Sequence, residues 1–240
     1  MSWNPYEHLP SAASFSLTSS DLREGEKLAM PQVSGIFGAG GQDVSPQLSW
    51  SGFPSGTQSF VVTMCDPEAP TVTGFWHWAV VNIPGNVTEL PAGAGDESGS
   101  GLPEGAFQLK NDARMACYVG AGPPEGHGRH RYIFAALALE AERVEIDKEA
   151  TPALLMFGRF NGTLGRALRN RETPPMKRGS QKPSLRRTQP GSTVRTNTLR
   201  LDRSPENCAF SPNWDGTGME QRGRNRWQRF SSRNAENRLN

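Results

Sequence analysis

Short apolar runs, separated at close intervals by proline and glycine, constrain the fold of this chain more than any other feature of its sequence. The clearest runs are residues 59–65, which end at Asp66, residues 75–83 and residues 132–140. Their length and their β-branched residues are typical of strands. A parallel α/β fold would need helices between successive strands, and the sequence has no helical pattern there. The sequence therefore predicts a mostly antiparallel β domain, either a sandwich or a barrel.

Three further segments complete the predicted domain. Residues 14–22 alternate Phe15 and Leu17 with small polar residues, as a half-buried strand does. Residues 150–168 carry leucines at helical spacing and are expected to form a single closing helix, which Gly158 and Gly165 weaken. Residues 91–105 are rich in Gly and Ser and are expected to form a surface loop.

The charge of the chain divides near residue 171. Residues 1–170 carry 11 Lys and Arg against 18 Asp and Glu, a net charge of −7, and residues 171–240 carry 15 against 6, a net charge of +9; together they give +2. The basic segment has only isolated apolar residues, so it is expected to be a disordered tail. Its Arg-rich stretch 222–230 contains aromatic residues, which could hold nucleic acid weakly, although a solvated tail without specific binding is the simpler interpretation. We therefore expect an N-terminal arm (1–12), a β domain (13–170) and a disordered basic tail (171–240).

The cysteines and the hydropathy bear on the compartment. Three scattered cysteines, Cys65, Cys117 and Cys208, do not form a disulfide framework or a CxxC metal site. The N-terminus lacks the positive cluster and apolar core of a secretory signal. No apolar run approaches the ~20 residues that span a bilayer. We expect a soluble, cytoplasmic protein without a membrane span.

Histidine gathers in two unusual stretches. His77 lies in residues 66–84, DPEAPTVTGFWHWAVVNIP, and His127 and His130 lie in residues 122–132, GPPEGHGRHRY. Histidine can change its charge near neutral pH, so this concentration indicates a site. Buried or loop histidines with satisfied hydrogen bonds are the alternative interpretation.

These two stretches resemble the phosphatidylethanolamine-binding protein (PEBP) family, in its bacterial Raf-kinase-inhibitor-like branch of YbhB and YbcL type. The segments SPQLSWSGFP (45–54) and RFNGTLGRA (159–167) are similar to the same branch, and the resemblance covers about residues 10–168. It implies a β-sandwich of two antiparallel sheets with a few peripheral helices. It also implies a small anion-binding pocket at one end of the sandwich.

Carried over residue by residue, the resemblance assigns seven residues to the ligand-binding pocket: Asp66, Pro70, His77, Gly122, Pro123, His130 and Tyr132. Pro70 is a candidate for a cis peptide bond. Strand parity places His77 on one face with Ala79 and Val81, and places Trp76 and Trp78 on the opposite face, in the core. No tyrosine follows Tyr132, so the segment that usually closes the pocket in this family is missing.

The implied ligand is a small anion or zwitterion, such as phosphate, a phosphoethanolamine-like group or acetate. Asp66 would either orient a histidine and raise its pKa or meet a cationic group of the ligand. We expect a binding module without cofactor, metal or enzymatic activity, which regulates a kinase or a protease by protein contact; a homodimer is compatible with this role. The alternatives are a small-molecule hydrolase that uses the Asp/His pocket, and a metal triad of Asp66, His77 and His130.

Overall fold

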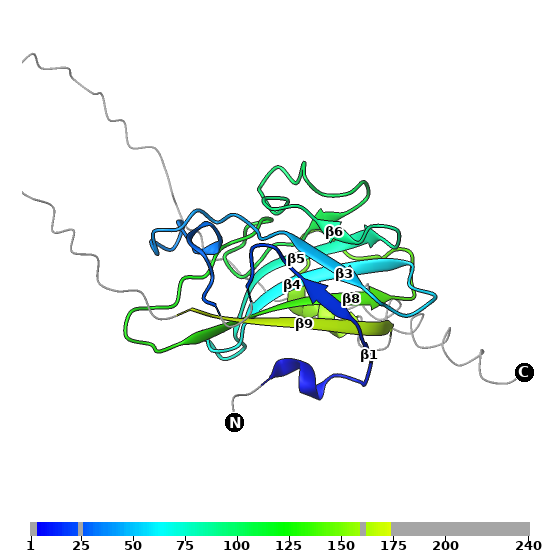
Figure 1. Cartoon of the computed structure of the whole chain (residues 1–240), viewed down its shortest axis with the longest axis horizontal. Coiled ribbons are helices and arrows are strands. Elements are labelled where there is room, and N and C mark those ends of the chain that lie inside the picture. Colours follow the sequence, from blue (N-terminus) through cyan, green and yellow to red (C-terminus); the bar gives the residue numbers. More distant parts are fainter. Residues whose placement is uncertain (1–3, 24–25, 159–161, 174–240) are drawn as a thin grey trace, which may run out of the picture. The chain divides into compact units, whose positions relative to one another are not determined.

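The computed structural model describes residues 4–23, 26–158 and 162–173, all within the first of two compact units, Met1–Pro183. Most of their regular structure is strand, and helices are few (Figure 1). The helical segments are η1 (Pro5–His8), η2 (Met30–Gln32) and α1 (Pro152–Gly158). This confirms the predicted fold class. The nucleic-acid and disorder predictions for the basic tail fall almost entirely outside the described residues.

The strands form two sheets. The larger sheet has the order β1 (Ala13–Ser14), β9 (Thr163–Thr173), β8 (His130–Leu139), β4 (Ser59–Asp66), β5 (Phe75–Pro84) and β7 (Phe107–Gln108). The smaller sheet has the order β2 (Ser16–Thr18), β3 (Leu48–Ser51) and β6 (Glu89–Leu90). Neighbouring strands are antiparallel, except that β1 pairs with β9 in parallel.

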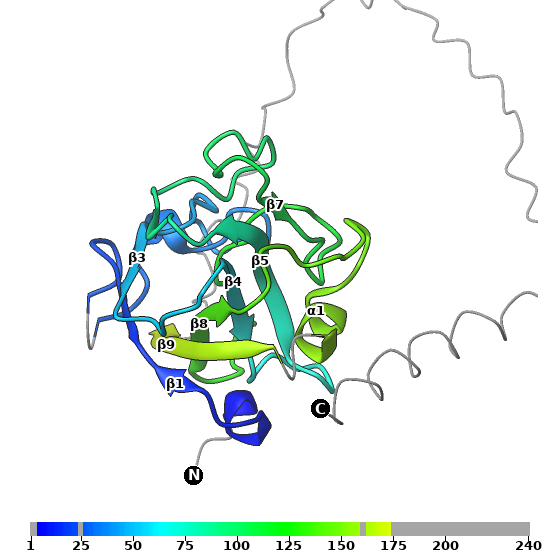
Figure 2. The ribbon, with the colours of Figure 1, turned by 90° about the vertical axis from the view of Figure 1, so that its right-hand side faces the viewer.

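Both faces of the larger sheet are covered, which explains why its central strands are apolar along their whole length. One face packs on the smaller sheet, where Tyr132, Phe134 and Met64 join Leu48 and Trp50 in one buried cluster. On the other face Leu155 of α1 packs on β4, β5 and β8, and Tyr6 of η1 packs on Cys65, Ile133 and Ala135. Figure 2 shows β3 and α1 on opposite sides of the central strands. The predicted sandwich is therefore a large sheet with a small sheet on one face and helical segments on the other.

The segment 150–168 corrects the sequence prediction. Instead of one helix, α1 ends at Gly158 and β9 begins at Thr163. Strand β9 pairs with β8 along the whole of β8, from Leu139 to His130. Without β9, the ten residues of β8 would form an edge strand whose backbone groups lack hydrogen-bonding partners on one side. Gly165 contributes because a Cβ there would lie 2.8 Å from Cδ of Pro54. Close packing against the sheet therefore outweighs the helical spacing of the leucines.

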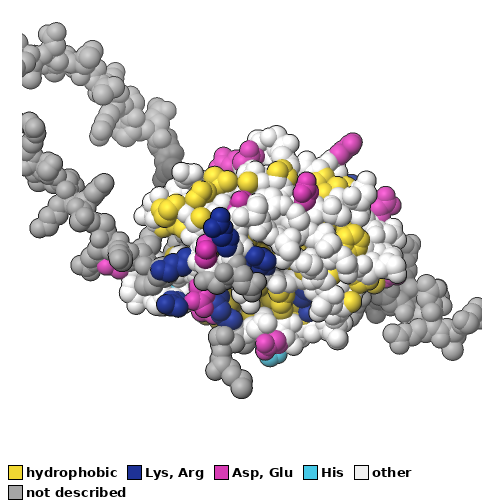
Figure 3. All heavy atoms as spheres, in the orientation of Figure 1, with side chains coloured by type: hydrophobic (Ala, Val, Ile, Leu, Met, Phe, Trp, Pro, Cys, Tyr) yellow, Lys and Arg dark blue, Asp and Glu magenta, His cyan; other side chains and the backbone are white. Residues whose placement is uncertain are grey.

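Strand β9 also anchors the N-terminal segment through its arginines. Arg166 donates to the backbone oxygens of Tyr6 and Pro10, and Arg169 donates to those of Leu17 and Leu22. Charges of both signs lie together at the surface of this region, as in the ion pair of Arg129 with Glu172. On the face shown in Figure 3, Lys and Arg side chains gather with Asp and Glu side chains among them.

Candidate functional site

A small cavity lies where three strands of the larger sheet end. Asp66 is the last residue of β4, Phe75 is the first of β5 and His130 is the first of β8. Because β4 is antiparallel to both neighbours, these three ends meet at one edge of the sheet. The cavity has a volume of about 350 Å³, and its lining residues are Phe37, Asp66, Ala69, Pro70, Thr71, Phe75, His77, Gly122, Pro124, His130 and Tyr132.

The cavity brings together six of the seven predicted residues. Pro123 is buried and does not line it, whereas the neighbouring Pro124 does. Pro70 lines the cavity, but all peptide bonds of the described residues are trans, so the predicted cis bond is wrong. Phe37 and Phe75 were not predicted. Phe37 is 40% exposed in the structure, and its only sequence signal is an aromatic residue within the glycine-rich segment 35–41.

A β-bulge directs His77 toward the cavity. Met64 pairs with Trp78 and Cys65 pairs with Trp76, so His77 is the extra residue between two pairs. The bulge lets His77 lie on the same side as Trp78, which packs with Tyr132 in the buried cluster between the sheets. The predicted parity is therefore correct for Trp76, which packs on the face opposite His77. It is wrong for Trp78, which shares the face of His77, and for Ala79 and Val81, which lie on the opposite face.

His77 is buried and held in one orientation. Its Nδ1 donates to the backbone oxygen of Val119 at 2.9 Å. Its ring lies between those of Phe75 and Tyr132, with centroids 4.8 and 5.2 Å away. Burial lowers the pKa of His77 to about 4, so the ring is neutral at pH 7. The expectation of a charged pocket histidine therefore does not hold for His77.

A chain of hydrogen bonds links the buried carboxyl group of Asp66 to the surface. His130 Nδ1 lies 2.6 Å from Asp66 Oδ2, and both side chains are almost fully buried. His130 Nε2 lies 2.9 Å from Nδ1 of the exposed His127. Burial raises the pKa of Asp66, and its contact with His130 opposes that shift. Asp66 thus orients His130, which is one of the two roles considered for it.

The hydroxyl group of Tyr132 is the unsatisfied group of the site. Tyr132 is fully buried, and its hydroxyl makes no hydrogen bond of normal geometry among the described residues, although the backbone of Gly122 and the carboxyl group of Asp66 lie near it. Burial, and then the nearby carboxylate of Asp66, raise its pKa, so the hydroxyl keeps its proton at neutral pH. It is therefore a donor available to a ligand in the cavity.

Gly122 lets the loop that follows residue 121 pass close to the cavity wall. A Cβ at Gly122 would lie 3.0 Å from Cβ of Phe37, closer than ordinary contact. Farther along the loop, Gly126 and Gly128 have φ angles of 76° and 91°, a conformation that glycine adopts without strain. These turns carry His127 back over His130.

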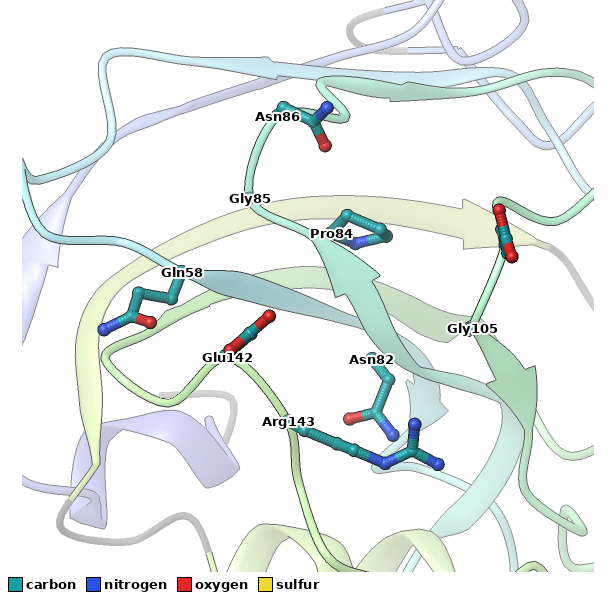
Figure 4. A pocket seen from close by; sticks show the side chains of 9 residues that line it. Gln58, Asn82, Pro84, Gly85, Asn86, Gly105, Glu142 and Arg143 are labelled. Atoms are coloured by element: carbon teal, nitrogen blue, oxygen red, sulfur yellow. The ribbon is translucent and has the colours of Figure 1, made fainter.

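A larger cavity, of about 520 Å³, lies at the other end of β5 (Figure 4). Asn82 is the buried polar residue of its wall, and its side chain is already bonded to the backbone of Val144 in both directions. The other polar groups there are exposed side chains such as Glu142 and Arg143. We therefore regard the smaller cavity as the candidate site.

The described residues contain no group of three or more His, Cys, Asp and Glu side chains placed to hold a metal ion. The alternative triad of Asp66, His77 and His130 is not among such groups in this part of the chain. Within the same residues, no helix is both long enough and apolar enough to cross a bilayer.

Comparison with known proteins agrees with the fold. The profile of phosphatidylethanolamine-binding protein matches residues 18–168. YbcL of Escherichia coli K12 is 47% identical over 146 residues, which are 61% of this chain and 80% of YbcL. YbhB of the same organism is 46% identical over 144 residues, 59% of this chain and 88% of YbhB.

Solved structures give the same result. The crystal structure of E. coli YbcL, described as a new member of the mammalian PEBP family, aligns with a TM-score of 0.66 and 42% identity, over 69% of this chain and 100% of that one. A PEBP homologue from Chlamydia trachomatis shares the fold, with a TM-score of 0.55 and 24% identity over 68% of this chain and 98% of that one. The chain belongs to the phosphatidylethanolamine-binding protein family.

Proposed function

We propose that the cavity at the ends of β4, β5 and β8 binds a small anionic or zwitterionic ligand, such as a phosphate-type group or acetate. The observation that carries this proposal is the buried hydroxyl of Tyr132 without a partner. Leaving such a group unsatisfied costs about 1–3 kcal/mol, which a ligand that accepts its hydrogen bond would recover. The family is a ligand-binding fold, which supports a binding module as the general class.

Binding is favoured over hydrolysis. A hydrolase needs a nucleophile beside its base. The nitrogen of His130 that does not contact Asp66 faces the ring of His127, not a hydroxyl or thiol group. Burial raises the pKa of Cys65 to about 12, so this thiol is not an activated nucleophile. We expect no turnover of ester and phosphoester panels by the purified chain.

A matched pair of tyrosine variants tests the binding site. Tyr132→Phe removes the hydroxyl without a partner, so phosphate binding should weaken by roughly ten- to a hundredfold, the effect of one charge-assisted hydrogen bond. Thermal stability should be unchanged or slightly higher. Tyr118→Phe removes a hydroxyl that donates to the backbone oxygen of Gln32 at 2.9 Å, so it should cost about 1–3 kcal/mol of stability and leave binding unchanged.

Isothermal titration calorimetry and thermal melts of the two variants measure these effects. Equal phosphate affinity of the wild type and Tyr132→Phe would refute the site. Weaker binding in Tyr118→Phe to the same extent would mean that general loosening of the core, rather than the hydroxyl of Tyr132, decides affinity.

We further propose that the protein acts in the cytoplasm and regulates a kinase or a protease by contact at the rim of the cavity. Ile36 and Val72, next to the lining residues Phe37 and Thr71, are apolar and exposed there. Replacing Ile36 and Val72 by Asp should abolish such inhibition and leave phosphate binding intact. Retained inhibition would place the protein contact elsewhere.

A further inference from the structure

The polar groups of the cavity divide into those already used within the protein and those left for a ligand. Both oxygens of Asp66 are used: Oδ1 accepts from the backbone N–H of Glu68 at 2.9 Å, and Oδ2 contacts His130 Nδ1 at 2.6 Å. The second nitrogen of His130 lies 2.9 Å from His127. His77 and Tyr132 therefore supply the side-chain groups that a ligand can use without breaking these hydrogen bonds of the site.

His77 offers an acceptor to the cavity. The backbone oxygen of Val119 can only accept, so Nδ1 of His77 carries the proton. The neutral ring then has a lone pair on Nε2. Burial has the largest effect on the pKa of this ring and lowers it, and the hydrogen bonds to the backbone of Val119 and Gly120 oppose that shift only in part. The ring is neutral at pH 5.5 and above, because its pKa is about 4.

Tyr132 offers a donor beside that acceptor. The two rings are in edge contact, with centroids 5.2 Å apart, so one small ligand can reach both. A ligand that satisfies the cavity must therefore accept from Tyr132 and donate to His77. A carboxylate or a phosphodiester has acceptor oxygens only, and its oxygen would face the lone pair of His77.

We infer that the cavity selects a phosphate group that still carries a proton, the monoanion of a phosphomonoester, over a phosphodiester. One oxygen of the group accepts from the hydroxyl of Tyr132, and its P–OH donates to Nε2 of His77. The inference rests on the proposed function and adds the ligand class to it. His77 is thereby the residue that sets specificity, and Tyr132 supplies affinity.

Four ligands test whether a P–OH group or an ammonium group donates the hydrogen bond to His77. Methyl phosphate has a P–OH and dimethyl phosphate has none; phosphoethanolamine has a P–OH and an ammonium group, and glycerophosphoethanolamine has the ammonium group only. Calorimetry of the full chain at pH 5.5 keeps monoesters mainly as monoanions, because their second pKa is about 6. Both monoesters should bind at least tenfold more tightly than their diesters, with or without the ammonium group.

The outcomes distinguish two claims, that the cavity binds a phosphate-type ligand and that it selects a protonated phosphate. Equal binding of methyl phosphate and dimethyl phosphate would overturn the selection for a protonated phosphate and leave the binding site standing. Tight binding of both ammonium ligands and weak binding of the other two would assign the donor to the ammonium group, which also overturns it. No binding of any ligand would refute the proposed function itself.

Two variants assign the selectivity to its residue. His77→Phe keeps an aromatic ring between Phe75 and Tyr132 and removes the lone pair, so the ratio of monoester to diester affinity should fall toward one. Tyr132→Phe should weaken all four ligands and keep the ratio. An unchanged ratio in His77→Phe would contradict the role of His77. Should that variant not fold, the ligand series on the unaltered chain still decides.

Discussion

At the scale of single residues, the hydrogen-bond partner, rather than residue type or burial alone, distinguishes the two histidines of the cavity. His77 and His130 are both almost fully buried, at 3% and 1% exposure, but their partners differ. His130 contacts a carboxyl group, whereas His77 contacts a backbone oxygen and two aromatic rings. A neutral carbonyl compensates a buried charge less than a carboxylate does. The same residue type therefore has two different functions within one site.

The depressed pKa of His77 predicts how stability depends on pH. The folded protein binds the proton at about pH 4 and the unfolded chain at 6.5, so the unfolded chain binds more protons between these values. Stability should therefore fall by up to about 3 kcal/mol as the pH is lowered from 6.5 to 4. The raised pKa of Asp66 acts in the opposite direction, with stability lost as the pH rises through its folded pKa.

Urea unfolding of the wild type and His77→Phe at several pH values between 4 and 7 isolates the contribution of His77, since Asp66 is common to both proteins. The variant should show a flatter curve, although its stability at pH 7 is lower because Val119 loses its donor. Parallel curves would contradict the assignment of the pH dependence to His77.

The same residues show what could be predicted of the site and what could not. The identity of the lining residues is local information in two motifs, so Asp66, His77, His130 and Tyr132 could be found from the sequence. The direction of His77 depends on the bulge opposite Met64 and Cys65 in another strand. A bulge depends on pairing with a distant segment, so strand parity alone gave the wrong face for Trp78.

At the scale of elements, β9 shows a local preference overridden by the tertiary structure. The leucines of residues 150–168 have helical spacing, but ten residues of β8 would otherwise form an unpaired edge. Small side chains at Gly165 and Ala167 let the strand approach its neighbours. The strands β4, β5 and β8 were predictable because a strand that is buried on both faces is a continuous apolar run. Such a run can be seen in the local sequence, without knowledge of the neighbouring strands.

Two glycine substitutions test the packing of β9. Gly165→Val should destabilise the domain by about 1–3 kcal/mol, because its Cβ would lie 2.8 Å from Pro54 and 3.0 Å from Phe15. Gly158→Ala at the end of α1 is the control, since no atom lies within 4 Å of the added Cβ. Denaturant unfolding of both variants should show a loss only for Gly165→Val. Equal stability would mean that β9 does not pack closely.

At the scale of the whole molecule, the core and the site lie largely in different parts of the fold, and Tyr132 belongs to both. The core lies between the two sheets and under α1, while the cavity lies at the strand ends, where loops can vary without exposing the core. The profile of the family ends at residue 168, and β9 continues to Thr173. Strand β9 therefore extends into the first three residues of the basic segment 171–240.

Removal of residues 176–240 should leave the domain folded and its ligand affinity unchanged. The deleted segment carries 14 Lys and Arg against 5 Asp and Glu, a net charge of +9, and the remaining 175 residues carry 12 against 19, a net charge of −7. Attraction between the two parts would be electrostatic and weakened by salt. We expect the melting temperatures of full-length and truncated protein to agree within about 5 °C, and to converge further at high salt.

Any retardation of nucleic acid should disappear on truncation and, in the full chain, fall steeply with salt because counterions are released. A truncated protein that melts well below this range at both salt concentrations would show that residues beyond 175 contribute to the core.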